Sequence, residues 1–348
     1  MDRRTVLTGA LAGAAAVALP RVARAADISG AGATFPYPIY AKWAAAYKDK
    51  TGIGLNYQAI GSGGGIKQIT ARTVVFGASD QPLDGKKLAE ITCTQFPMVM
   101  GGVVPVMNLP DITPGQLVLD GPTLADLYMG NIANWNDAKI QALNPDAKLP
   151  DLAVAPVYRS DGSGTTYNFT NYLAAVSEPF KSAIGVASSV KWPSGIGGKG
   201  NDGVANMVTQ TQGGLGYVEY AYVKQNKMTY ARMVNTAGKV VEPGAESFQA
   251  AAANADWANS DHFAVLLGNQ PGDKSWPITA ATFILFPTDP KDPAIAKSAL
   301  DFFAWAYAEG DEMALALDYV PMPDEVVKLA KDSWSAIKGP DGAALWSA

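Results

Sequence analysis

Histidine and cysteine are scarce in this chain of 348 residues, which holds one of each, His262 and Cys93. A metal-dependent hydrolase needs a cluster of histidine and carboxylate ligands, and a serine hydrolase needs a base beside its nucleophile. His262 stands in the polar segment 259–263, which indicates a surface turn. With one cysteine no internal disulfide can form, and we expect Cys93 to be a small buried residue. The sequence therefore argues against an enzyme and predicts no catalytic residue, metal or cofactor.

Basic residues are outnumbered, 27 against 32 acidic ones, and no run of them occurs. Proteins that bind nucleic acid gather lysine and arginine on one surface. The acidic balance therefore excludes nucleic acid as a partner. An anionic ligand would have to be held by local donors against the field of the whole chain.

Long hydrophobic runs are also absent, and the apolar stretch 6–19 is too short to span a bilayer comfortably. It follows Arg3 and Arg4 and precedes a small-x-small cleavage pattern at 23–25. This arrangement predicts an export signal over residues 1–25. The arginine pair fits a twin-arginine signal, and an ordinary Sec signal is the alternative. We expect the rest of the chain to work in a bacterial periplasm.

Short buried segments alternate with helical ones, which is typical of an α/β fold with mostly parallel sheets. The expected strands are 52–60, 74–77, 98–107, 153–158, 214–220 and 281–286. The expected helices are 36–50, 165–176, 202–211, 294–308 and 324–337. In such folds ligands bind at the carboxyl ends of strands, where helices begin.

Three stretches place a hydroxyl and glycines before an expected helix: 33–35, 60–64 and 159–165. A helix N-terminus has free N–H groups and a positive dipole end, so it can receive an anion. A simple strand-to-helix turn is the alternative for any one of them. Three together, with Arg159 beside the last, predict a small tetrahedral oxyanion held from several sides.

Two nucleotide motifs are incomplete. The segment 30–35 begins like a dinucleotide fingerprint, but Phe35 stands where the third glycine belongs, and no suitable acidic residue follows about 20 positions on. The glycines at 61–65 lack the Gly-Lys-Ser/Thr ending of a P-loop. Neither nucleotide binding nor nucleotide hydrolysis is expected.

Arg159 offers a planar fork of donors suited to an oxyanion, and Asp161 is near enough in sequence to hold the guanidinium. A surface ion pair is the alternative. Asp80 follows an expected strand and so lies near the ligand. An ionised carboxylate accepts the O–H of hydrogen phosphate, whereas sulfate has no hydrogen to give at neutral pH. Asp80 would therefore discriminate between the two anions.

Several motifs together resemble the periplasmic phosphate-binding proteins of phosphate-specific ABC importers. The resemblance runs from Gly30 to the last expected helix, and its motifs are residues 30–36, 57–64, 76–80, 119–124, 159–165, 191–193, 197–203 and 216–222. The order and identity of the three anion-binding elements make it specific. One departure is Val75, where the family often has aspartate.

The resemblance implies a type II two-lobed α/β binding protein, with lobe 1 formed by residues 26–105 and 275–348 and lobe 2 by 106–274. It implies a monomer that binds phosphate and passes it to membrane permease subunits. Asp161 would support Arg159 from behind. Arsenate, which is also protonated, is the alternative ligand. The implied phosphate contacts are Thr34, Phe35, Ser62, Asp80, Arg159, Ser163, Gly164 and Thr165.

Overall fold

A computed structural model describes residues 27–346 of the chain. The predicted signal at 1–25 lies outside the described residues. Between residues 27 and 346, no helix combines the length and the apolar character needed to cross a membrane.

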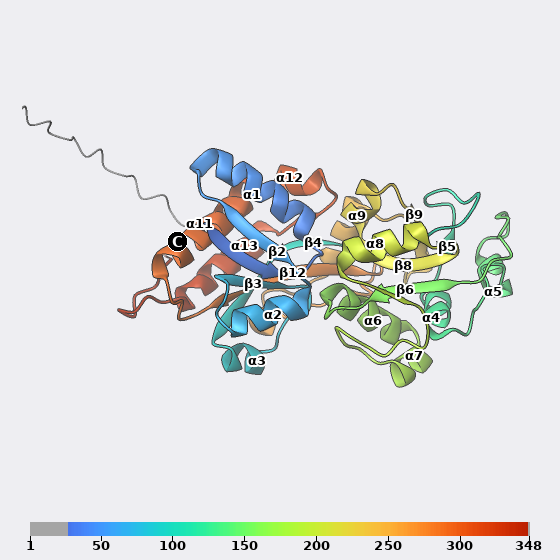
Figure 1. The fold of residues 1–348 in the computed structure, drawn as a ribbon, viewed down its shortest axis with the longest axis horizontal. Helices are drawn as coiled ribbons and strands as arrows, with labels where there is room; N and C mark the ends of the chain where they lie inside the picture. Colours follow the sequence, from blue (N-terminus) through green and yellow to red (C-terminus); the bar gives the residue numbers. More distant parts are fainter. Residues whose placement is uncertain (1–26, 347–348) are drawn as a thin grey trace, which may run out of the picture.

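The chain alternates strands and helices over most of its length (Figure 1). The strands are β1 (Ile28–Gly32), β2 (Leu55–Ala59), β3 (Phe76–Ser79), β4 (Cys93–Met107), β5 (Val118–Leu119), β6 (Ala155–Arg159), β7 (Ile196–Gly198), β8 (Gly214–Glu219), β9 (Thr229–Tyr230), β10 (Arg232–Val234), β11 (Val240–Val241), β12 (Thr279–Pro287) and β13 (Val320–Pro321). The helices are α1 (Tyr37–Thr51), α2 (Ser62–Thr70), α3 (Gly85–Glu90), α4 (Gly121–Met129), α5 (Ala138–Leu143), α6 (Gly164–Val176), α7 (Glu178–Ala183), α8 (Gly200–Gln210), α9 (Tyr220–Gln225), α10 (Ala245–Ala252), α11 (Pro293–Glu309), α12 (Asp311–Leu315) and α13 (Asp324–Ser333), with two 3-10 turns, η1 (Asp261–Phe263) and η2 (Trp334–Ala336).

Strand β4 links two groups of elements (Figure 1). Its first part pairs with β12, in the blue and orange group that holds β1, β2 and β3. Its last five residues pair with β8, in the green and yellow group that holds β6 and β7. The order across the whole sheet is β2-β1-β3-β12-β4-β8-β6-β7. One continuous strand therefore belongs to both halves of the sheet.

The sheet is mixed. The pairs β1–β2 and β1–β3 are parallel, as are β6–β7 and β6–β8. Strands β4 and β12 run antiparallel to their neighbours β3 and β8 and to each other. The expectation of mostly parallel sheets therefore holds only at the outer strands, since the two strands that join the halves run the other way.

Each expected strand and helix is present, with ends shifted by a few residues. Strand β4 is longer than expected, and the strands β1, β5, β7, β9, β10, β11 and β13 lie outside the expected set. Strand β4 begins at Cys93, five residues before the expected start, although Gln95 and Pro97 interrupt the apolar pattern. The Gln95 amide is satisfied in the core by the backbone of Leu83 and the carbonyl of His262. Strand β1 includes the first residues of the glycine-rich segment 30–35, for which the sequence predicts a binding loop and no strand.

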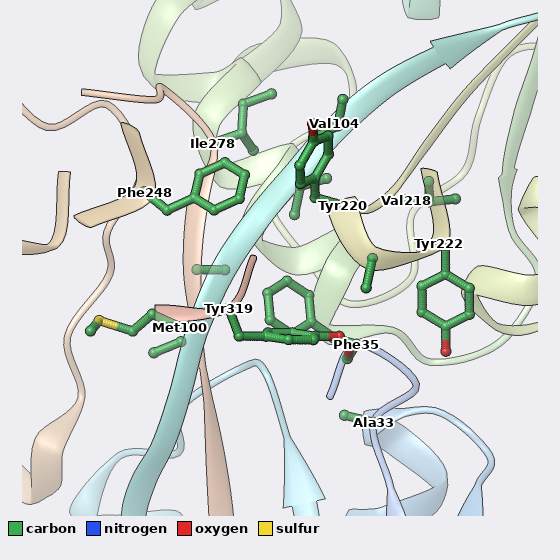
Figure 2. Packing of buried hydrophobic residues seen from close by; sticks show 14 of the residues in the cluster. Ala33, Phe35, Met100, Val104, Val218, Tyr220, Tyr222, Phe248, Ile278 and Tyr319 are labelled. Carbon is green, nitrogen blue, oxygen red and sulfur yellow. Dashed lines mark hydrogen bonds between the residues drawn. The ribbon is translucent and has the colours of Figure 1, made fainter. Parts of the chain in front are cut away.

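Apolar side chains surround β4 where it passes between the halves (Figure 2). Phe248 packs so closely on the strand that a Cβ at Gly102 would lie 2.1 Å from its ring. Phe35 and Tyr319 meet edge to face, with ring centroids 6.2 Å apart. This core holds the loop at 33–36 against the junction, and that loop leads into the candidate site.

Candidate functional site

The N-termini of α2 and α6, which lie about a hundred residues apart in sequence, meet directly. Gly63 N donates to Gly162 O at 2.9 Å, and Gly164 N donates to Ser62 Oγ at 3.0 Å. Ser163 caps α6, since its hydroxyl accepts a hydrogen bond from Thr166 N at 3.0 Å. The remaining N–H groups of both first turns have no acceptor within their own helix. Two positive helix ends thus converge on one point.

Glycine is required for this close approach. A Cβ at Gly164 would lie 2.6 Å from both Asp80 Cβ and Ser62 Oγ. Gly61 has φ +87°, and a Cβ there would lie 2.1 Å from Asp161 Oδ2. Neither position has room for a side chain. The glycines are therefore more than turn formers, because they let the two halves touch.

We call Thr34, Phe35, Ser62 and Asp80 the first side of the site, and Arg159, Asp161, Ser163, Gly164 and Thr165 the second side. All nine were singled out by the sequence, and the structure brings them together at the junction of the two halves. Their roles as ligand contacts stay predictions.

Arg159 ends β6 and is 4% exposed, so the surface ion pair considered for it is wrong. Its Nε and Nη2 donate to Asp161 Oδ1 and Oδ2 at 2.8 and 2.6 Å, and Nη1 lies 3.3 Å from Thr165 Oγ1. Asp161 Oδ1 also accepts a hydrogen bond from Gly200 N at 3.0 Å. Burial would raise the pKa of Asp161, but hydrogen bonding and charge from Arg159 outweigh it and lower that pKa. One edge of the guanidinium is thus fixed and the other points toward Thr165.

Asp80 directly follows β3 and is 1% exposed. Its backbone is held by both sides: its N–H donates to Ser62 Oγ at 3.2 Å, and its carbonyl accepts from Asn168 Nδ2 at 2.7 Å. Its carboxylate oxygen Oδ1 is buried and has no hydrogen-bond partner among the described residues. Burial raises the pKa of Asp80 to about 7, although the charge of Arg159 and the neighbouring hydroxyl of Thr282, whose Oγ1 forms no hydrogen bond among the described residues, lower it. Asp80 thus presents a buried carboxylate oxygen that is left to accept a hydrogen bond.

The loop before α1 is fastened by its carbonyls. Thr34 O accepts from Tyr222 Oη, and Phe35 O accepts from Tyr319 Oη, both at 2.6 Å. The Thr34 and Phe35 side chains are buried. With the carbonyls held on one side of the loop, its N–H groups are left for the site.

Three buried residues that support the site are missing from the predicted contacts: Asn201, Glu219 and Tyr319. Asn201 and Glu219 lie in the motifs 197–203 and 216–222, which carry the family resemblance without pointing to a role for either residue. Asn201, in the first turn of α8, contacts Thr34 and Thr165. Tyr319 Oη lies 2.7 Å from Glu219 Oε2 and 2.6 Å from Phe35 O. A phenol has one hydrogen, so both contacts are hydrogen bonds only when Glu219 carries a proton. Burial raises the pKa of Glu219 well above its usual range, in agreement with that count.

His262 and Cys93, for which the sequence predicts no functional role, lie away from the candidate site. His262 is half-exposed in the turn η1, where its ring is close to Gly85. Cys93 is buried at the start of β4, and burial raises the pKa of its thiol. Over residues 27–346, no group of three or more histidine, cysteine, aspartate and glutamate side chains is placed to hold a metal ion.

Comparison with known proteins defines the class first. A family model described as the PBP superfamily domain matches residues 20–309. Among solved structures, a phosphate-binding protein from Stenotrophomonas maltophilia superposes with a TM-score of 0.65 at 19% identity, covering 88% of this chain and 93% of its own. A human phosphate-binding apolipoprotein gives a TM-score of 0.71 at 20% identity, with coverage of 88% and 94%. The predicted α/β fold of the periplasmic binding proteins is confirmed.

Sequence relatives narrow the class to a family. The phosphate-binding protein PstS of Pasteurella multocida is 53% identical over 93% of this chain and 94% of its own length. The PstS of Haemophilus influenzae is 51% identical over 90% and 93%. The chain belongs to the PstS family of phosphate-binding proteins.

Proposed function

We propose that this protein binds inorganic phosphate in the periplasm and delivers it to the permease subunits of an ABC-type phosphate importer. It would do so as a monomer, after export through the signal at 1–25, without cofactor or chemical reaction. The names of its relatives in two bacteria support the ligand. The signal at 1–25, which lies outside the described residues, fits export by the twin-arginine route, and the Sec route is the alternative.

The observation that carries the proposal is the surroundings of Asp80. This buried carboxylate with an unpartnered Oδ1 stands among donors: Arg159, the hydroxyls of Ser62 and Thr165, and first-turn N–H groups of α2 and α6. Donors bind the oxygens of any tetrahedral oxyanion. A lone acceptor among them favours an oxyanion that keeps a hydrogen, which phosphate does and sulfate does not.

The strength of such a site follows from its number of donors. Micromolar affinity needs roughly 8 kcal/mol. A hydrogen bond to a charged group contributes about 1.5–3 kcal/mol net. The first and second sides together supply enough donors to reach that value after the entropy of association and the desolvation of the anion are subtracted.

We further propose that the lobes are formed by residues 26–105 with 275–348 and by residues 106–274, and that phosphate holds them together. Several hydrogen bonds join the two proposed lobes in this structure, among them those between Gly63 and Gly162, Ser62 and Gly164, Asp80 and Asn168, and Thr34 and Asn201. The segment from α10 to η1, assigned to lobe 2, packs along β4 and β12 at the junction. A ligand that contacts both sides favours their closed arrangement.

The test is a calorimetric titration of the ligand-free protein with phosphate, sulfate and arsenate at about pH 9, where Asp80, whose pKa is about 7, is ionised. We expect tight phosphate binding and no heat from sulfate. Equal binding of sulfate, or no binding of phosphate, would contradict the proposal. Arsenate that binds more tightly than phosphate would make arsenate, the second candidate, the ligand, since Asp80 accepts a hydrogen from either anion.

A further inference from the structure

Asn201 is a fully buried amide that contacts both sides of the site. Its Nδ2 lies 2.8 Å from Thr34 Oγ1 on the first side and 3.2 Å from Thr165 Oγ1 on the second. Its backbone N–H also donates to Thr34 Oγ1, at 3.1 Å. Its Oδ1 accepts from Glu219 N at 2.9 Å. Asn201 is therefore hydrogen-bonded at every part of its side chain.

The direction of this amide is fixed by chemistry. Glu219 N–H can only donate, so the atom that faces it must be the oxygen. The NH₂ group must then face the two threonine hydroxyls, and its two hydrogens supply one donor to each. Toward Thr34 and Thr165, the side chain of Asn201 is therefore a hydrogen-bond donor and cannot be an acceptor.

The hydrogen bonds donated to the Thr34 and Thr165 hydroxyls determine whether each hydroxyl can still accept a hydrogen bond. A hydroxyl has two acceptor positions and one hydrogen. At Thr34 both acceptor positions are filled by Asn201, through N and Nδ2. At Thr165 they are filled by Asn201 Nδ2 and Arg159 Nη1. Each threonine is left with its hydrogen to give and no acceptor position to offer.

We infer that Asn201 is a positioning residue, which directs the hydroxyl hydrogens of Thr34 and Thr165 toward the bound oxyanion. This inference rests on the proposed phosphate binding and deepens it. Because Asn201 is in α8 and Thr34 precedes α1, the arrangement at Thr34 is complete only when the two sides are in contact. Closure of the site thus turns a hydroxyl that can donate or accept into one that donates.

The hydroxyl of Ser62 also has both acceptor positions filled, although neither donor is Asn201. Its Oγ accepts from Asp80 N and, across the site, from Gly164 N. The Ser62 hydrogen is therefore also free to be donated. Asp80 is left as the acceptor among three hydroxyls that all donate, which is the pattern that favours a protonated oxyanion.

The first test is Asn201→Asp, which keeps the shape and the acceptor for Glu219 N but replaces the NH₂ donor with an oxygen. The two threonine hydroxyls would then donate to residue 201. We expect phosphate affinity in calorimetry to fall by about 100-fold, from the loss of hydrogen bonds to a charged ligand. Asn144→Asp is the matched control, since Asn144 is buried in the same way but bonds Val118 and Ile140.

The Asn144 control should keep wild-type phosphate affinity even if its melting temperature falls. An equal loss of affinity in the control would mean that any buried amide matters, which would overturn the inference. So would wild-type affinity in a folded Asn201→Asp variant. No phosphate binding by the wild type would remove the proposed function itself, and the two failures are thereby distinguished.

A double-mutant cycle tests the route of the effect and does not depend on Asn201→Asp folding. Asn201→Ala is measured in the wild type and in a Thr34→Val, Thr165→Val background. If Asn201 acts through the two hydroxyls, we expect about a tenfold loss of phosphate affinity in the wild type and almost none in the background. Equal losses in both would show a purely structural role.

Discussion

The two sides of the site contribute different chemistry. The second side carries the permanent positive charge, Arg159, already paired with Asp161 at 2.6 Å. The first side carries Asp80, a carboxylate with an unpartnered oxygen and a pKa raised by burial to about 7. We therefore expect the second side to supply most of the affinity for the anion, and the first side to supply the selectivity for phosphate over sulfate. Because Asp161 neutralises Arg159, the second side offers hydrogen bonds more than net charge.

The largest effect should come from removing the guanidinium of Arg159 from the second side. Arg159→Ala should lower the affinity for phosphate by about 3 kcal/mol or more, since it removes charge-assisted donors from a buried site. It should also lower the melting temperature, because Asp161 loses its partner. Calorimetry and thermal unfolding measure both.

Arg72→Ala is the matched control for that change. Arg72 also pairs with an aspartate, Asp289, at 2.8 Å, but it follows the C-terminal end of α2 and its side chain contacts Cys93 at the start of β4, away from the site. It should leave phosphate affinity unchanged. If the Arg159→Ala variant binds phosphate as tightly as the control variant does, the second side does not supply most of the phosphate affinity.

The next effect should come from the acceptor on the first side. Asp80→Asn replaces that acceptor with an amide that can also donate. Phosphate binding should weaken by about 1.5–3 kcal/mol, while sulfate binding should become measurable. Competition calorimetry with both anions checks this, and Asp84→Asn, a helix cap in α3, is the control. Unchanged selection against sulfate would rule out Asp80 as the discriminating residue.

The pH dependence sharpens the same comparison without mutation. With a pKa of about 7, Asp80 is mostly ionised above pH 7 and mostly protonated below it. Protonated Asp80 can donate to sulfate, whereas ionised Asp80 repels it. Sulfate affinity should therefore fall about tenfold per pH unit above pH 7 and level off below it. Phosphate, which keeps a hydrogen throughout this range, should vary far less, and a sulfate profile without slope would contradict the assignment.

Ser62→Ala should give the smallest effect. Ser62 Oγ accepts hydrogen bonds from Asp80 N and Gly164 N, so its loss weakens the contact between the sides. The substitution also removes one hydroxyl donor to the ligand. We expect a decrease of about 1 kcal/mol in phosphate binding. Ser247→Ala, which removes a buried hydroxyl bonded to the carbonyls of Glu242 and Gly244, is the control and should bind normally.

The helix starts of this site could be predicted because their signals are local. Gly61 before α2, the Ser163 cap of α6 and the proline before α1 are each read from a few adjacent residues. Arg159 and Asp161 are two residues apart, so their pairing could be inferred from the sequence alone. The same holds for Asp80, which directly follows a short buried strand.

The contacts of the supporting residues could not be predicted, even for Asn201 in the singled-out motif 197–203, because their partners are distant in sequence. Asn201 meets Thr34 across 167 residues, and Tyr319 meets Phe35 across 284. No periodicity or spacing marks such pairs. The start of β4 could not be predicted for another reason: Gln95 and Pro97, which pair with β12, break the apolar pattern of the strand.

The central claim is that Asp80 accepts a hydrogen from the ligand while the surrounding hydroxyls donate to it. Neutron diffraction from crystals of the phosphate complex above pH 7 observes those hydrogens directly. The account predicts a hydrogen between Asp80 and a phosphate oxygen, with the hydrogens of Thr34, Ser62 and Thr165 pointing at phosphate. An Asp80 carboxylate that receives its hydrogen from a protein hydroxyl, with none shared with phosphate, would contradict it.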